Sequence, residues 1–124
     1  MYEVSVEATF SAAHNLRGYH GKCENLHGHN YRVLVVAAGR ELDEAGLLYD
    51  FAYLKQALRA VVGELDHRYL NEMPPFDQIN PSAENIARYI HEETVKQMTP
   101  ATNGAALASV TVWETDTSSA TYRP

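Results

Sequence analysis

The chain is organised around residues 22–31, which read Lys-Cys-Glu-Asn-Leu-His-Gly-His-Asn-Tyr. His27 and His29 stand one residue apart at the start of an alternating apolar segment. Side chains of a strand repeat their direction every second residue, so both imidazoles are expected on one face, where they can share a metal ion. Gly28 lets the backbone pass close to a ligand. Cys23, the only cysteine, lies four residues before His27 and follows a lysine.

The segments on either side of this stretch alternate between apolar and polar residues, which is the pattern of half-buried strands. In residues 2–14 the apolar parity ends at His14, and in the second strand it includes His27 and His29. Polar residues 15–26 predict a long loop that joins the two strands as an antiparallel pair. A lone histidine on an apolar face is more often a hydrogen-bonded core residue. Three histidines of matching parity favour a functional interpretation.

Two amphipathic helices are expected in the middle of the chain. Asp50 is a good N-cap, and apolar residues then recur at helical spacing over 51–65. Several prolines interrupt the pattern that follows. Asn80 and Pro81 suit a cap and the first position of a second helix, because proline is favoured at that position.

The last part of the chain returns to strand. Val110, Val112 and Glu114 share one parity, so Glu114 is a carboxylate on a face that is otherwise apolar. Residues 119–123 predict a short final strand. The element order β-β-α-α-β-β predicts a single α+β domain over residues 1–124, a length that fits one hydrophobic core.

Composition excludes several classes of protein. The formal net charge of −6 argues against a nucleic-acid binder, which usually needs a basic face. One cysteine cannot form an internal disulfide, so nothing indicates an oxidising compartment. The N-terminus has no signal-peptide pattern, and no apolar run approaches the ~18–20 residues of a membrane helix. We therefore expect a cytoplasmic protein that binds neither nucleic acid nor membrane.

Three histidines on adjacent strands, with no evident fourth protein ligand, match a catalytic zinc site. Such sites use three protein ligands and leave one position for water or substrate. A structural zinc site would need four ligands, commonly several cysteines. Cys23 as a fourth ligand is one alternative, and imidazole alone also suits iron, nickel or copper.

Other polar residues allow a functional and a structural interpretation. Cys23 next to a cation is either a reactive thiolate or an inert small hydrophobe. Asp66 and His67 follow the first helix and are either an acid–base pair or a favourable interaction with the helix dipole. His20 and His91 are interpreted as a loop residue and a helix-surface residue.

A set of motifs covers nearly the whole chain in a fixed order. They are Phe10-Ser11-Ala12-Ala13-His14, Cys23-x-x-x-His27-Gly28-His29-Asn30-Tyr31, Asp50-Phe51, Leu65-Asp66-His67, Leu70-Asn71, Pro81-Ser82-Ala83-Glu84-Asn85 and Glu114-Thr115. In these motifs the chain resembles the 6-pyruvoyl-tetrahydropterin synthase and 6-carboxytetrahydropterin synthase family. The resemblance implies the tunnelling fold (T-fold), a four-stranded antiparallel sheet with two helices on one face. It also implies a homohexamer of two stacked trimers, which would cover the open sheet edges.

The resemblance also implies roles for single residues. His14, His27 and His29 would be the zinc ligands, and Cys23 would be the thiol that abstracts a proton. The family's active sites lie at subunit boundaries. The acid–base pair at residues 66 and 67 would therefore serve the Cys23 of a neighbouring subunit.

Recognition of the pterin is implied for two further positions. Glu114 would anchor the ring, its carboxylate accepting two N–H bonds from the aminopyrimidinone edge. Ser82 matches a hydroxyl position near the pterin, whereas Ala83 stands where animal members have threonine. The basic residues nearest the motifs, and hence candidates for a triphosphate, are Arg17, Lys22 and Arg68.

The spacing Cys-x-x-x-His-Gly-His resembles the bacterial enzyme of the queuosine pathway, a 6-carboxy-5,6,7,8-tetrahydropterin synthase. Its substrate would be 7,8-dihydroneopterin triphosphate, and its products 6-carboxytetrahydropterin, acetaldehyde and triphosphate. A 6-pyruvoyl-tetrahydropterin synthase is an alternative. Glu24 also fits the Glu-x-x-His-Gly-His spacing of a folate branch that forms 6-hydroxymethyl-dihydropterin. A non-catalytic module that binds metal or pterin is the alternative from another class.

Overall fold

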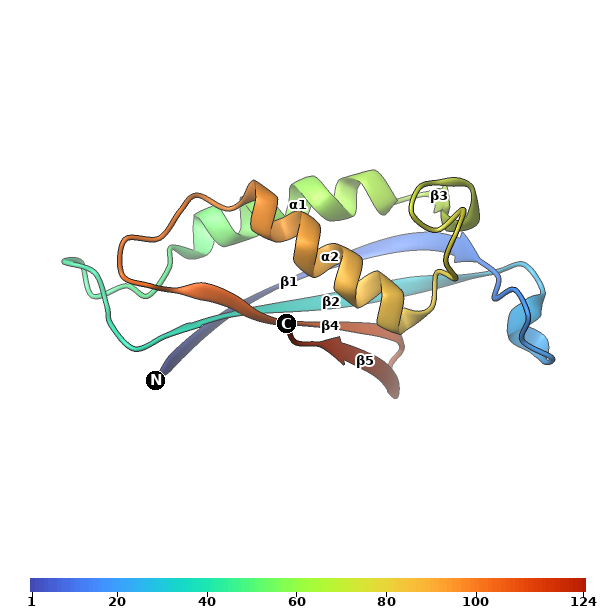
Figure 1. The fold of residues 1–124 in the computed structure, drawn as a ribbon, viewed down its shortest axis with the longest axis horizontal. Coiled ribbons are helices and arrows are strands. Elements are labelled where there is room, and N and C mark those ends of the chain that lie inside the picture. Colours follow the sequence, from blue (N-terminus) through green and yellow to red (C-terminus); the bar gives the residue numbers. More distant parts are fainter.

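The computed structural model describes residues 1–124 as one twisted sheet with two helices packed on one of its faces (Figure 1). The strands are β1 (Tyr2–His14), β2 (His27–Gly39), β3 (Arg68–Tyr69), β4 (Ala106–Thr115) and β5 (Ser118–Tyr122). The helices are α1 (Phe51–Leu65) and α2 (Ala83–Gln97), and short 3-10 turns cover Lys22–Glu24 and Leu70–Glu72. The α+β class and the single layer of two helices are as predicted.

The sheet has five strands in the order β3-β1-β2-β4-β5, one more than the four predicted. The additional strand is β3, which pairs in parallel with Ala12 and Ala13 of β1. Two residues are too few to produce an alternating pattern, so this strand left no signal in the sequence. The four longer strands are antiparallel to their neighbours, as expected.

The pairing of β1 with β2 sets the positions of the histidines. The two strands are antiparallel over their whole length, with His14 opposite His27 and Ala12 opposite His29. Directly paired residues point to the same face of a sheet, so the three imidazoles share the face that the helices cover. The same parity of β2 continues into the fully buried Tyr31, Val33 and the rest of the core.

Both helices begin at side-chain caps. Asp50 accepts a hydrogen bond from the N–H of Ala52 at 2.7 Å, and α1 spans residues 51–65 as predicted. The predicted start of α2 at Pro81 is wrong by two residues, since Ser82 is the N-cap. The side chain of Asn80 binds the backbone of Arg17 instead and is not available as a cap.

His91 is a second correction, because it does not lie on the helix surface. Its side chain on α2 is buried, with 7% of its area exposed, and its Nε2 lies 2.9 Å from the carbonyl oxygen of Leu107. The ring also packs edge-on against Tyr122 of β5. Neither helix of the structure is long and apolar enough to span a bilayer.

Candidate metal centre and active site

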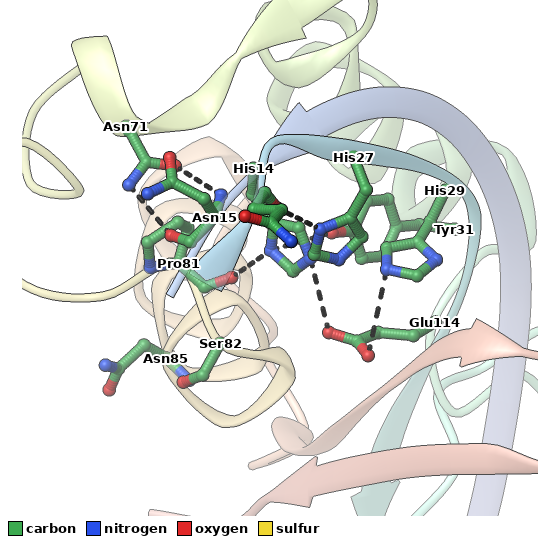
Figure 2. A network of polar contacts seen from close by, with 11 residues as sticks. His14, Asn15, His27, His29, Tyr31, Asn71, Pro81, Ser82, Asn85 and Glu114 are labelled. Carbon is green, nitrogen blue, oxygen red and sulfur yellow. Dashed lines mark hydrogen bonds and ion pairs between the residues drawn. The ribbon is translucent and has the colours of Figure 1, made fainter. Parts of the chain in front are cut away.

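The ends of β1 and β2 bring three imidazoles together at one end of the sheet (Figure 2). The ligand nitrogens of His14, His27 and His29 all lie within 4.8 Å of one another. Zinc–nitrogen bonds of about 2.0–2.1 Å place the ligands of a tetrahedral ion roughly 3.3–3.4 Å apart. The three side chains therefore need only small adjustments to share one ion.

Backbone carbonyls orient two of these rings. The Nδ1 of His14 lies 2.6 Å from the carbonyl oxygen of Pro81, and the Nδ1 of His27 lies 2.6 Å from that of Asn25. A carbonyl oxygen only accepts hydrogen bonds, so each Nδ1 is the protonated, donating nitrogen. The Nε2 atoms then face each other with their lone pairs, 3.0 Å apart. A cation between them removes the repulsion of the two lone pairs.

The third ring supports the same conclusion. The Nε2 of His29 is buried and has no hydrogen-bond partner. A buried polar atom without a partner costs about 1–3 kcal/mol, and such atoms are rare in folded proteins. A metal ion bound to this nitrogen would remove the cost.

Burial also favours the ligating form of the imidazoles. Desolvation lowers the pKa of His14 and of His29, against an opposing effect of the nearby Glu114 carboxylate. Metals bind neutral imidazole, so this shift prepares the rings for a ligand. Three neutral nitrogen donors are a set that suits zinc, and the cluster could hold such an ion.

Glu114 of β4 lies beside the histidine cluster on the face that its parity predicted. Its carboxylate oxygens are 3.8 Å from the Nε2 of His14 and 4.0 Å from the Nε2 of His29 (Figure 2). Tyr31 lies behind the rings, its hydroxyl 3.2 Å from the Nδ1 of His14. Burial and the Glu114 charge raise the pKa of Tyr31, so its phenol stays neutral. Glu114 is therefore the nearest anion to the cluster.

Cys23 lies in the 3-10 turn of the loop that joins β1 to β2. The side chain is half-buried, and the residue's carbonyl accepts a hydrogen bond from the N–H of Leu16 at 2.7 Å across the loop. The thiol is not among the side chains of the metal cluster, which consists of histidines alone. The loop therefore connects the thiol to the ligands without making it a fourth ligand.

The pair formed by Asp66 and His67 lies on the outer edge of β1. The Nδ1 of His67 is 2.9 Å from the Asp66 carboxylate, and the second carboxylate oxygen accepts the N–H of Ser11 at 2.9 Å. The N–H of His67 in turn donates to the carbonyl of Ser11 at 2.6 Å. These bonds retain His67 at a φ of 58°, which is sparsely populated for residues other than glycine.

The charge and exposure of this pair suit proton transfer. The hydrogen bond from the N–H of Ser11, with a second from His67, lowers the pKa of Asp66. The His67 side chain is 82% exposed and borders a cavity of about 490 Å³, together with Asn30 and Arg68. No hydrogen bond or ion pair links the pair to Cys23 in one chain.

Two of the remaining candidates have structural partners. The hydroxyl of Ser82 accepts the N–H of Asn85 at 3.2 Å, so only its proton is free for a ligand. The guanidinium of Arg17 donates to the carbonyls of Phe76 and Ile79 at 2.7 and 2.9 Å, which removes it as a candidate for the triphosphate. Lys22 and Arg68 form no ion pairs, and the loop residue His20 is exposed as predicted.

The sequence did not indicate that the carbonyl of Pro81 orients His14. The contact joins residues 67 positions apart in the chain, and any residue type supplies a carbonyl. Only the path of the backbone shows it.

A twisted antiparallel sheet, two helices on one face and a histidine cluster at one end together define the tunnelling fold of pterin synthases. The family model described as 6-pyruvoyl tetrahydropterin synthase matches residues 3–124. A solved structure of 6-pyruvoyl tetrahydropterin synthase from Caenorhabditis elegans superposes with a TM-score of 0.82 at 34% identity, covering 100% of this chain and 97% of that one. The chain belongs to the 6-pyruvoyl tetrahydropterin synthase family, which is a family of enzymes.

Two curated relatives carry different activities in their names. A 6-carboxy-5,6,7,8-tetrahydropterin synthase of Bacillus subtilis is 35% identical, over 99% of this chain and 86% of its own length. A dihydroneopterin monophosphate aldolase of Pyrococcus furiosus is 36% identical, over 86% of this chain and 84% of its own length. Overall identity thus does not choose among the family's activities.

Proposed function

We propose that this chain is a zinc-dependent 6-carboxy-5,6,7,8-tetrahydropterin synthase. It converts 7,8-dihydroneopterin triphosphate and one water into 6-carboxytetrahydropterin, acetaldehyde and triphosphate, the reaction assigned to queuosine biosynthesis. The observation that carries the proposal is the histidine cluster, whose ligand nitrogens lie within 4.8 Å of one another. The relative in Bacillus subtilis and the Cys-x-x-x-His-Gly-His spacing favour the carboxy product.

The metal would be bound by His14, His27 and His29. When bound, zinc supplies Lewis-acid polarisation of the substrate's side-chain oxygens, which acidifies the adjacent C–H. The protein contributes the orientation of the rings, because two of the Nδ1 atoms are committed to backbone carbonyls.

Two groups move protons during the reaction. The Cys23 thiolate removes the proton from the acidified carbon of the substrate side chain. His67, oriented by Asp66 through the contact of 2.9 Å, exchanges protons with the side-chain oxygens as triphosphate leaves and the C–C bond breaks. Because the pair has no contact with Cys23 in its own chain, it would act on the substrate of a neighbouring subunit.

Recognition of the pterin is assigned to the opposite side of the cluster. Glu114 accepts two N–H bonds from the aminopyrimidinone edge, a charge-assisted pair that fixes the ring's orientation. Its side chain is 25% exposed, so a ligand can reach the carboxylate. The free proton of the Ser82 hydroxyl is available for a further bond to the ring.

The shared site requires assembly into a homohexamer. β3 covers β1 only at Ala12 and Ala13, so the rest of that strand is an open edge, and the outer edge of β5 is open as well. Open edges readily pair with another chain. Sedimentation at working concentration is expected to show six copies, and a monomer would contradict both the assembly and the shared site.

A second product is supported by Glu24. This exposed carboxylate directly follows Cys23 in the same 3-10 turn, and the aldolase of Pyrococcus furiosus shows that a relative of similar identity carries another activity. Formation of 6-hydroxymethyl-dihydropterin is therefore the second candidate function. A 6-pyruvoyl-tetrahydropterin product and a module without turnover are the remaining outcomes of the test.

The test is identification of the products by mass spectrometry. Protein loaded with zinc is incubated with 7,8-dihydroneopterin triphosphate, beside a sample treated with a chelator. We expect 6-carboxytetrahydropterin and acetaldehyde from the loaded sample and neither from the treated one. A pyruvoyl or hydroxymethyl pterin as the main product would replace the assignment, and binding without turnover would refute the enzyme.

A further inference from the structure

Two asparagines hold the backbone that follows His14 in a fixed path. The side-chain amide of Asn71 accepts the N–H of Asn15 and donates to its carbonyl, both at 2.9 Å (Figure 2). The amide of Asn80 does the same for Arg17, at 2.9 and 2.8 Å. Residues 15 and 17 are two apart, so their backbone groups lie along one edge of an extended segment. Two amide side chains thus take the place of a pairing strand.

The same two asparagines belong to the connection between α1 and α2, which carries Pro81. The backbone carbonyl of Asn80, next to Pro81, accepts the side-chain amide of Asn85 at 2.9 Å. The guanidinium of Arg17 binds the carbonyls of Phe76 and Ile79 in that connection. The connection is therefore attached at several points to the three residues that follow His14.

This attachment places the Pro81 carbonyl at the imidazole. The orienting carbonyl of His27 comes from Asn25, only two residues away in the same loop. That of His14 comes from 67 residues away and depends on the fold to arrive 2.6 Å from Nδ1. A hydrogen bond at one nitrogen fixes the tautomer and the ring direction of a metal-ligating histidine. A shift of the connection would release His14 from the orientation that points Nε2 to the cluster.

We propose that Asn71 and Asn80 are positioning residues for the metal centre. They act through residues 15 and 17 and the Pro81 carbonyl to orient His14, and they touch neither metal nor substrate. The inference rests on the metal centre of the proposed function. It goes beyond that function because it assigns a task to two amides outside the ligand set.

Metal affinity separates positioning from a merely structural role. We would measure zinc affinity by competition with a chromophoric chelator, and the visible spectrum of the cobalt-substituted protein, for the full-length Asn71→Ala and Asn80→Ala variants. Substitution of partners that orient metal ligands typically weakens metal binding ~10–100-fold. We expect a loss of that size in both variants and an altered cobalt spectrum, with the far-ultraviolet circular dichroism unchanged.

Asn103→Ala is the matched control. The amide of Asn103 donates to the carbonyls of Glu41 and Leu48 at 3.0 and 2.9 Å and accepts the N–H of Ala105 at 3.1 Å, so it also joins distant backbone segments. None of these partners belongs to the metal cluster. This variant is expected to lose thermal stability to a similar degree and to retain wild-type zinc affinity.

The remaining outcomes each decide the inference. Folded Asn71→Ala and Asn80→Ala variants with wild-type zinc affinity would overturn it, as would an equal loss of affinity in Asn103→Ala. If Asn80→Ala does not fold, Asn80→Asp retains the acceptor for the N–H of Arg17 and loses only the donor, and it is judged by the same affinity measurement. A wild-type protein without zinc affinity would refute the metal centre itself, which is a different result from variants that bind as wild type.

Discussion

Substitution of Ser82 tests two roles of one hydroxyl. As the N-cap of α2, Ser82 accepts the N–H of Asn85 at 3.2 Å, and the proposed function also gives its proton to the pterin. Loss of a serine cap costs about 1 kcal/mol. With roughly 2.1 cal/mol/K of unfolding entropy per residue, a chain of 124 residues has about 0.26 kcal/mol/K in total. Ser82→Ala is therefore expected to lower the Tm by about 4 °C.

Asp50→Ala is the control for the capping role alone. Asp50 caps α1 through a 2.7 Å bond from the N–H of Ala52, and α1 and α2 are both 15 residues long. The two variants are expected to lose similar Tm values at one protein concentration. Only Ser82→Ala should raise the KM for 7,8-dihydroneopterin triphosphate, by roughly 3–10-fold, the value of one neutral hydrogen bond of about 0.5–1.5 kcal/mol.

Differential scanning calorimetry and steady-state kinetics on the two variants decide between the roles. A Ser82→Ala variant with the wild-type KM would show that the hydroxyl caps the helix and does not bind the pterin. An unchanged Tm in both variants would refute the capping energies.

The remaining predictions concern the chemistry and the recognition of the substrate. Cys23→Ala should retain zinc content and pterin binding while turnover falls ~10²–10⁴-fold, as expected for loss of a general base, and full carboxytetrahydropterin synthesis by this variant would exclude the thiol as the base. Glu114→Ala should weaken pterin binding in titration calorimetry, because paired charge-assisted bonds are lost, while metal analysis still finds zinc. Glu24→Ala should spare carboxytetrahydropterin formation and abolish any hydroxymethyl-dihydropterin seen by mass spectrometry, and persistence of that by-product would remove Glu24 from its formation.

Several parts of the fold could be predicted because their signals are local. The alternation over residues 2–14 predicted β1 with its observed ends, and helical spacing after Asp50 predicted α1. The short strand β3 could not be predicted, because two residues carry no period. His91 was assigned to the helix surface, yet the carbonyl of Leu107 gives this polar side chain a buried partner.

The candidate site divides in the same way. The parity of His14, His27 and His29 predicted a shared face from the sequence, since a strand alternates its side chains and paired residues point the same way. The position of Glu114 on that face followed from the same rule. The sequence could not indicate that Asp66 binds the backbone of Ser11, a contact across 55 residues.

The sequence by itself determined which residues could meet, because strand and helix periods depend on near neighbours along the chain. Only the tertiary structure decided how they are oriented. The Nδ1 of His14 is bound by a carbonyl 67 residues away, and that carbonyl is positioned by amides of the connection between the helices. Backbone groups are the same in every residue, so a contact between distant backbone and side chain leaves no pattern in the sequence. The physical reason is that its geometry depends on the path of the whole chain.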